Sequence, residues 1–298
     1  MDLLLPDIIK KYIDKSIENI VSFNNDNKPK GANFIQPTHI LEPDLSFKTN
    51  GEPAIDINHV QDGYVVAQAI SAARLKFQVR QENQIYNYDL PNNGTQTVYP
   101  LNMGNGHYKF RIMQNVSGNN YFELYSVETD VSLTSEFAPF LIANLYCNYN
   151  KSSTCVNKAR ELTKQVSNVA EAVKVICEFV AINITYDSTK AKELAHKSGY
   201  IPNPDETLAT GKGICFDYTS LSAAMLRSLG IPTKIVTGYV GCDKVYHSWI
   251  MVYINGTWHS TNFIINPNVW SLCDITFAST GVTQFVGNEN SYIERFIY

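Results

Sequence analysis

The sequence lacks several patterns that would place a chain of 298 residues in a functional class at once. It has no run of about 18 apolar residues, so no membrane-spanning helix and no membrane partner are expected. It has no basic excess, with 24 Lys and Arg against 28 Asp and Glu, so a nucleic-acid partner is not expected. None of its six cysteines forms a Cys-x-x-Cys pair, and no histidine lies at zinc-finger spacing. A structural metal site is therefore not expected.

The start of the chain has no pattern of a secretory signal. Its apolar run, Leu3-Leu4-Leu5, is too short and follows an acidic residue. This favours a cytoplasmic location, or an extracellular or cell-surface one if a signal was removed. Cys147 and Cys155 are close enough in sequence to bridge in an oxidising compartment, although an even number of cysteines in a chain this long is weak evidence for disulfides.

Changes in pattern along the chain predict three parts. Residues 1–55 form an N-terminal helix over 1–24 and an irregular connector rich in Asn, Pro, Asp and Gly. Residues 56–135 hold short alternating segments separated by turn residues, which predicts a small β-sandwich of immunoglobulin-like type. Residues 136–298 mix helical and strand patterns, with a linker predicted over 187–210. The fold class expected is therefore α+β.

Cys215 is the residue with the strongest chemical signal. It follows Gly211 and Gly213 and precedes a long apolar-periodic stretch that ends at Gly230, with Pro232 just beyond. This pattern predicts a helix that begins at the cysteine. The unpaired N–H groups and the dipole at a helix N-terminus stabilise a thiolate, which is the nucleophilic form.

A histidine and a carboxylate follow at later positions. His247 opens a strand-like run, His247-Ser248-Trp249-Ile250, and Asp274 follows near a further strand predicted over 269–275. Asn255-Gly256, between two apolar runs, predicts a hairpin turn. A nucleophile at a helix start, with a base and an orienting carboxylate on later strands, is the arrangement that a cysteine hydrolase or acyltransferase needs.

Several short motifs together resemble the transglutaminase-like superfamily of papain-type cysteine enzymes. The resemblance covers about residues 155–280, and the accessory segment before it looks like that of bacterial members. The motifs, in order, are Gly213-Ile214-Cys215-Phe216-Asp217-Tyr218, Gly230-Ile231-Pro232-Thr233-Lys234, Gly238-Tyr239, His247-Ser248-Trp249 and Trp270-Ser271-Leu272-Cys273-Asp274.

The resemblance implies a papain-like core, in which a helix carrying the thiol packs on an antiparallel sheet. It also implies a triad in which Cys215 attacks an acyl carbon, His247 transfers the proton and Asp274 orients the imidazole. The backbone N–H of Cys215 would be one oxyanion donor. The chemistry implied is acyl transfer from an amide of a protein or peptide through a thioester, with hydrolysis favoured over cross-linking. No metal or organic cofactor is implied.

The third member of the triad has an alternative. Trp-x-x-x-Asp follows the histidine strand after one hairpin in simple members, but here the first such Trp is Trp258 and the matching position is Asn262. The second is Trp270, which leads to Asp274. Asp274 is preferred because its carboxylate carries the full charge that stabilises an imidazolium, and Asn262 is kept as the alternative.

The residues around the triad, and the activity of the protein, each have a second interpretation. Asp217, Tyr218 and Trp249 are candidates for the substrate cleft; packing within the helix is the alternative for Tyr218, and packing that shields the triad is the alternative for Trp249. The alternative to an enzyme is a non-enzymatic transglutaminase-like scaffold that binds a peptide or glycan.

Overall fold

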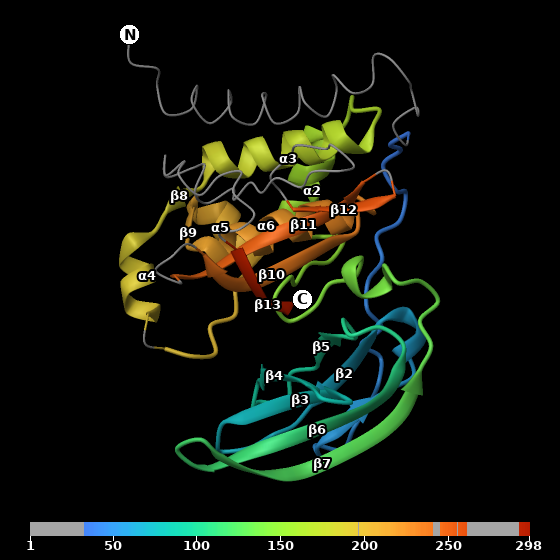
Figure 1. The fold of residues 1–298 in the computed structure, drawn as a ribbon, viewed down its shortest axis with the longest axis vertical. Helices are drawn as coiled ribbons and strands as arrows, with labels where there is room; N and C mark the ends of the chain where they lie inside the picture. Colours follow the sequence, from blue (N-terminus) through green and yellow to red (C-terminus); the bar gives the residue numbers. More distant parts are fainter. Residues whose placement is uncertain (1–32, 196, 241–244, 255, 261–291) are drawn as a thin grey trace. The chain divides into compact units, whose positions relative to one another are not determined.

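The computed structural model of the chain describes residues 33–195, 197–240, 245–254, 256–260 and 292–298. The chain divides into two compact units (Figure 1). The helical unit contains the described residues up to Leu41 and those of Tyr146–Tyr298, and the β unit is Glu42–Leu145. The helix predicted over residues 1–24 lies outside the described residues.

The β unit contains two antiparallel sheets (Figure 1). The first has the order β1-β2-β5 and the second has the order β4-β3-β6-β7. The strands are β1 (Ala54–Asp56), β2 (Tyr64–Gln68), β3 (Leu75–Gln81), β4 (Gln84–Leu90), β5 (Thr97–Pro100), β6 (Gly106–Ser117) and β7 (Asn120–Val131). Two short 3₁₀ helices, η1 (Val60–Asp62) and η2 (Ala138–Phe140), complete the unit.

Alternation of apolar and polar residues explains the strands of the β unit. Leu75, Phe77 and Val79 of β3 are buried, while the residues between them are partly exposed, as period-2 patterning requires. Phe77 stacks on Tyr99 of β5 with ring centroids 4.2 Å apart, so side chains of the two sheets pack together. The immunoglobulin-like sandwich expected here stays a prediction.

The helical unit contains five described helices and a four-stranded antiparallel sheet of order β12-β11-β10-β13. The helices are α2 (Thr154–Leu162), α3 (Val169–Asn183), α4 (Ser188–Leu194), α5 (Pro204–Thr210) and α6 (Cys215–Ser228). The strands of the sheet are β10 (Thr233–Val240), β11 (Val245–Ile254), β12 (Thr257–Ser260) and β13 (Tyr292–Ile297), and a parallel pair is formed by β8 (Thr185–Tyr186) and β9 (Lys212–Gly213). Helices and separate antiparallel sheets confirm the α+β class.

The segment predicted to be a linker, 187–210, instead contains α4 and α5. Asp187 caps α4 by accepting a hydrogen bond from the N–H of Lys190, and Asn203 caps α5 in the same way. Pro204 is the first residue of α5, where its missing N–H costs nothing. A proline that starts a helix and the polar residues that cap it resemble loop residues in the sequence.

The helix α6 lies at the centre of the helical unit (Figure 1). It packs against α2, α3 and α5 and against the strands β10 and β11. Every residue of Asp217–Ser228 is buried. The helix ends as predicted at Gly230, whose φ of 75° lets its N–H reach the carbonyl of Arg227 while the N–H of Ile231 reaches Leu226.

The division of the chain differs from the three predicted parts. Residues 33–41 belong with the helical unit, because the N–H of Phe34 donates to the carbonyl of Ser167 and the side chain of Gln36 donates to the carbonyl of Arg160. The β unit in turn begins at Glu42 and extends to Leu145. Asn168 caps α3, because its side-chain oxygen accepts a 2.8 Å hydrogen bond from the N–H of Glu171.

Candidate active site

Cys215 is the first residue of α6, as its glycine-rich approach predicts, and it is half-buried. Of the 14 residues of this helix, only Cys215 and Phe216 are not buried. A helix enclosed in this way reaches solvent only at its N-terminus. The sulfur of Cys215 therefore lies at the one place on α6 where a thiol can meet a substrate.

The first turn of α6 offers backbone N–H groups to this place. The N–H groups of Asp217 and Tyr218 both donate to the carbonyl of Ile214, at 2.9 and 3.1 Å. Among the described residues, no acceptor is found for the N–H groups of Cys215 and Phe216. Together with the helix dipole, these two groups can stabilise a thiolate or an oxyanion beside the sulfur.

The chain before Cys215 is fixed by the β8–β9 pair. The N–H of Thr185 donates to the carbonyl of Gly211 at 2.8 Å, and the N–H of Asp187 donates to that of Gly213 at 2.9 Å. A Cβ atom at Gly213 would lie 2.5 Å from the Cβ of Asp217, closer than two non-bonded carbon atoms can approach. Glycine at position 213 is therefore required by the packing of the loop on the helix.

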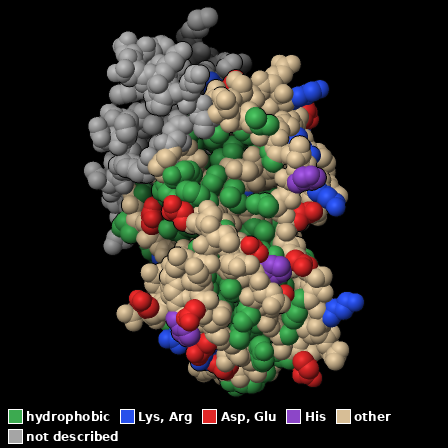
Figure 2. All heavy atoms as spheres, turned by 90° about the vertical axis from the view of Figure 1, so that its right-hand side faces the viewer, with side chains coloured by type: hydrophobic (Ala, Val, Ile, Leu, Met, Phe, Trp, Pro, Cys, Tyr) green, Lys and Arg blue, Asp and Glu red, His purple; other side chains and the backbone are tan. Residues whose placement is uncertain are grey.

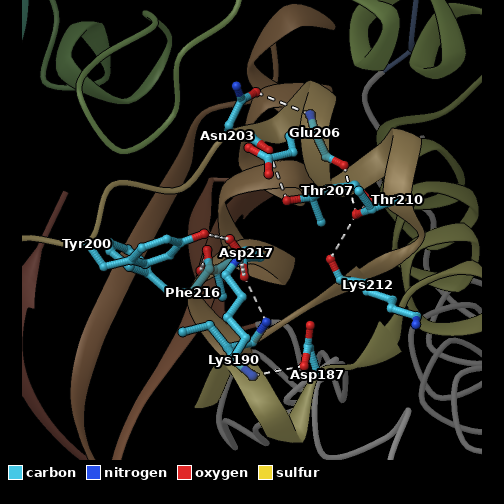
Figure 3. Close-up of polar contacts among 12 residues, drawn as sticks. Asp187, Lys190, Tyr200, Asn203, Glu206, Thr207, Thr210, Lys212, Phe216 and Asp217 are labelled. Carbon is cyan, nitrogen blue, oxygen red and sulfur yellow. Dashed lines mark hydrogen bonds and ion pairs between the residues drawn. The ribbon is translucent and has the colours of Figure 1, made fainter. Parts of the chain in front are cut away.

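The carboxylate of Asp217 holds the start of the helix together (Figure 3). Its Oδ2 accepts a 2.8 Å hydrogen bond from the N–H of Ile214, the residue before the nucleophile. Its Oδ1 accepts from the hydroxyl of Tyr200, and the Nζ of Lys190 lies 2.8 Å from Oδ2. Asp217 is fully buried, so it is a charged group that needs such partners.

The two side-chain partners of Asp217 also contact each other (Figure 3). The Nζ of Lys190 lies 4.6 Å from the centroid of the Tyr200 ring, a cation–π contact. Burial, and then the carboxylate of Asp217, raise the pKa of Tyr200, so its hydroxyl remains a donor. The side chain of Lys190 is 28% exposed. Both residues were missed from the sequence, because they lie in the predicted linker and reach Asp217 only through the fold.

His247 lies near the start of β11, opposite Gly238 of β10, and is 5% exposed. The next residue, Ser248, forms a buried 2.9 Å hydrogen bond with Thr219 of α6. Thr219 lies one helical turn after Cys215. This bond therefore joins the strand segment that carries His247 to the beginning of the helix that carries Cys215.

Trp249 packs on the other side of β11 from Ser248, because side chains alternate along a strand. Its ring meets that of Tyr292 edge-on at 5.1 Å. A Cβ at Gly238 would lie 3.0 Å from the Trp249 ring and 2.0 Å from the carbonyl oxygen of Ile293. The glycine at 238 thus makes room for the tryptophan and for β13.

The three residues considered for a substrate cleft are all buried. Asp217 and Tyr218 have no exposed surface, and Trp249 is 1% exposed. The hydroxyl of Tyr218 donates to the carbonyl of Ile184 at 2.5 Å. These surroundings favour the packing alternative for Tyr218 and Trp249, and they give Asp217 a role in holding the loop.

The third member of the predicted triad lies outside the described residues. This is true of Asp274, of the alternative Asn262, and of the strand predicted over 269–275. The hairpin before them is confirmed, since Ile254 pairs with Thr257 and Gly256 has a φ of 88°.

The other described cysteines differ from Cys215 in their burial. Cys147, Cys155 and Cys177 are all buried and free of disulfides. Burial raises the pKa of Cys147 to about 11 and that of Cys177 to about 12. Thiols in such surroundings are poor nucleophiles.

Other kinds of site were also sought in the described part of the chain. It contains no group of three or more His, Cys, Asp or Glu residues that could hold a metal ion. None of its helices combines the length and the apolar character needed to cross a membrane. On the face shown in Figure 2, the basic and acidic side chains of the described residues are interspersed rather than separated by sign.

A comparison with protein families relates part of this chain to a known superfamily. Residues 156–263 match the family model described as the transglutaminase-like superfamily. The chain carries a transglutaminase-like domain. The matched part of this domain includes Cys215 and His247; it also includes Asn262, whereas Asp274 lies beyond its end.

Individual proteins resemble parts of this chain. A UPF0252 protein of Archaeoglobus fulgidus is 30% identical over 120 residues, which are 33% of this chain and 38% of that protein's length. A crystal structure of a candidate cysteine protease from Cytophaga hutchinsonii is 17% identical, with a TM-score of 0.42 over 79% of each chain. Red sea bream transglutaminase is 11% identical, with a TM-score of 0.28 over 82% of this chain and 51% of its own. At such low TM-scores, the two structural likenesses carry no weight for function.

Proposed function

We propose that the transglutaminase-like domain is a cysteine-dependent acyl-transfer enzyme that hydrolyses an amide of a protein or peptide substrate. Cys215 is its nucleophile and His247 its general base, and Asp274 orients the imidazole, with Asn262 as the alternative. The observation that carries the proposal is the position of Cys215 as the half-buried first residue of an otherwise enclosed helix.

The proposed reaction has two steps. The thiolate of Cys215 attacks the carbonyl carbon of the amide, and the N–H groups of Cys215 and Phe216 stabilise the oxyanion. The C–N bond breaks, the amine leaves with a proton from the imidazolium of His247, and a thioester remains. Water then attacks the thioester after giving a proton to His247, and the thiol is released with the acid product.

Labelling with iodoacetamide tests the nucleophile directly. We expect Cys215 to react fastest among the six cysteines near neutral pH, as measured by site-resolved mass spectrometry. His247→Gln is expected to slow this reaction near neutral pH, because a neighbouring imidazolium stabilises the thiolate. Cys177 in the same chain is the internal control. Uniformly slow labelling of all six cysteines would instead support the scaffold that binds a peptide or glycan.

Two variants separate the candidates for the third member. If Asp274 orients His247, Asp274→Asn lowers turnover by a factor of about 10²–10⁴, while Asn262→Ala leaves turnover within about threefold of the wild type. The reverse result assigns the role to Asn262.

Two assays with casein as the protein substrate distinguish hydrolysis from transfer. Fluorescein-labelled casein reports the release of peptides, and unlabelled casein with dansylcadaverine reports the incorporation of an amine. We expect the first signal, and we expect Cys215→Ala to abolish it. Incorporation of the amine without peptide release would assign a transferase.

A further inference from the structure

Asp217 creates an electrostatic problem for the proposed nucleophile. Its buried carboxylate lies in the first turn of α6, two residues after Cys215. A negative charge in the same helical turn disfavours a second negative charge on the sulfur. Left alone, the carboxylate would offset the stabilisation that the helix N-terminus gives to a thiolate.

Lys190 supplies the compensating charge. Its Nζ lies 2.8 Å from Oδ2 of Asp217 and is held over the ring of Tyr200. The helix that carries Lys190 is itself fixed, because Asp187 caps it through the N–H of Lys190 at 2.9 Å (Figure 3). The ammonium group thus reaches the carboxylate from a separate helix in a defined position.

We propose that Lys190 is a positioning residue which neutralises Asp217 and thereby lets the N-terminus of α6 keep Cys215 in its nucleophilic form. The inference rests on the proposed function, since only a reacting thiol needs this compensation. The carboxylate of Asp217 holds the loop before the nucleophile in place by accepting a hydrogen bond from the N–H of Ile214. Lys190 compensates the negative charge that this carboxylate places in the same helical turn as Cys215.

The charged and titratable groups around this site come from several elements. Tyr200 remains neutral near physiological pH, because burial and then the carboxylate of Asp217 raise its pKa. Lys212 is exposed on β9, and His247 comes from β11. The described charged and titratable groups on these elements include Asp187, Lys190, Tyr200, Glu206, Lys212 and His247, together with Lys192 and Glu193 of α4 and Asp205 of α5.

The test measures the rate of iodoacetamide alkylation at Cys215 against pH, by site-resolved mass spectrometry on the full chain. In Lys190→Gln, the midpoint of this profile is expected to rise by about half a unit or more, because the carboxylate is then uncompensated. Lys190→Arg keeps the charge and is expected to keep the midpoint. Lys174→Gln is the matched control: its side chain is 24% exposed against 28% for Lys190, and it pairs with Glu178 at 3.5 Å on α3.

A second variant separates charge from structure. Asp217→Asn removes the negative charge but leaves Lys190, so the midpoint is expected to fall, and the double variant Lys190→Gln/Asp217→Asn is expected to return toward the wild type. A purely structural role of Lys190 would lower the melting temperature without moving the midpoint, and that result would overturn the inference. A double variant that keeps the midpoint of Lys190→Gln would overturn it as well. If Asp217→Asn does not fold, the midpoints of Lys190→Gln, Lys190→Arg and Lys174→Gln decide whether the charge of Lys190 acts on Cys215.

The same profiles separate a failure of this inference from a failure of the proposed function. If His247→Gln moves the midpoint and Lys190→Gln does not, the nucleophile stands and the role of Lys190 is wrong. If Cys215 reacts no faster than Cys177 in the wild-type chain, the proposed function itself is wrong.

Discussion

The side-chain oxygens of Thr219 and Ser248 lie 2.9 Å apart in a buried contact between α6 and β11. Each hydroxyl also lies near a backbone carbonyl, Thr219 at 3.1 Å from that of Phe216 and Ser248 at 3.1 Å from that of Val236. The pair therefore ties the first turns of the helix to the strand at one position along both elements.

Removing either hydroxyl of this pair is expected to lower the free energy of unfolding, and the effects of the two removals are expected not to be additive. Thr219→Val and Ser248→Ala each remove one hydroxyl and are expected to lower the free energy of unfolding by about 1 kcal/mol, measured by urea denaturation. Because the two groups contact each other, the double variant should lose less than the sum, with a coupling of about 0.5 kcal/mol or more. Strictly additive losses would show that the two hydroxyls do not interact.

Replacement of Gly213 is expected to damage the start of α6. An alanine Cβ would press on that of Asp217, so Gly213→Ala should cost about 1–3 kcal/mol and slow the alkylation of Cys215. Gly230→Ala at the other end of the helix is the control. Its Cβ would meet open space, and only the positive φ of 75° costs about 1 kcal/mol, with no effect on Cys215. Equal labelling rates in the two variants would contradict the role of Gly213.

Asp205 is expected to give the fold a dependence on acid pH. Its Oδ1 accepts from the N–H of Cys155 at 2.9 Å, at the N-terminus of α2. Burial alone would raise the pKa of Asp205, but donors from Cys155, Thr154 and Ser153 outweigh it and lower the pKa below its ordinary value of 3.8.

Because the pKa of Asp205 is lowered on folding, its contribution to stability is present above pH 3.8 and lost as the pH falls through the folded value. Asp205→Asn should therefore be less stable than the wild type at neutral pH, and the difference should shrink below pH 3.8 in urea denaturation series. Asp130→Asn, at a carboxylate whose side chain is 90% exposed, is expected to change little at either pH. A difference for Asp205→Asn that stays constant with pH would contradict the prediction.

The buried cysteines are expected to resist labelling until the chain unfolds. Cys147 and Cys177 have no or little exposed surface, and burial raises the pKa of both thiols. Their alkylation in the native protein should thus follow the opening of the fold and accelerate strongly in urea. Fast native labelling of Cys177 would show that α3 opens locally.

Local signals predicted those parts of the fold that are determined locally. The apolar run between Gly213 and Gly230 predicted the start and end of α6, and alternation predicted strands such as β3 and β11. The cap at Asn168 is likewise a local feature, because its side-chain Oδ1 accepts a hydrogen bond from an N–H only three residues away.

Contacts between distant segments could not be predicted from the sequence. Lys190 and Tyr200 belong to the stretch predicted to be a linker, and they meet Asp217 only after α4 and α6 have packed. An acidic residue at the third position of a helix suggests a bond to its own first turn, as Asp217 shows, but not which cation will pair with it. The pairing depends on tertiary structure and on no local pattern.

The enclosure of α6 limits how this protein can acquire a new selectivity. Substitutions anywhere from Asp217 to Ser228 disturb the interior, so directed evolution is expected to find few tolerated changes there. Useful diversity is instead available at Phe216 and in the stretch around Tyr200, where side chains border the exposed end of the helix and a library can vary them without repacking the interior.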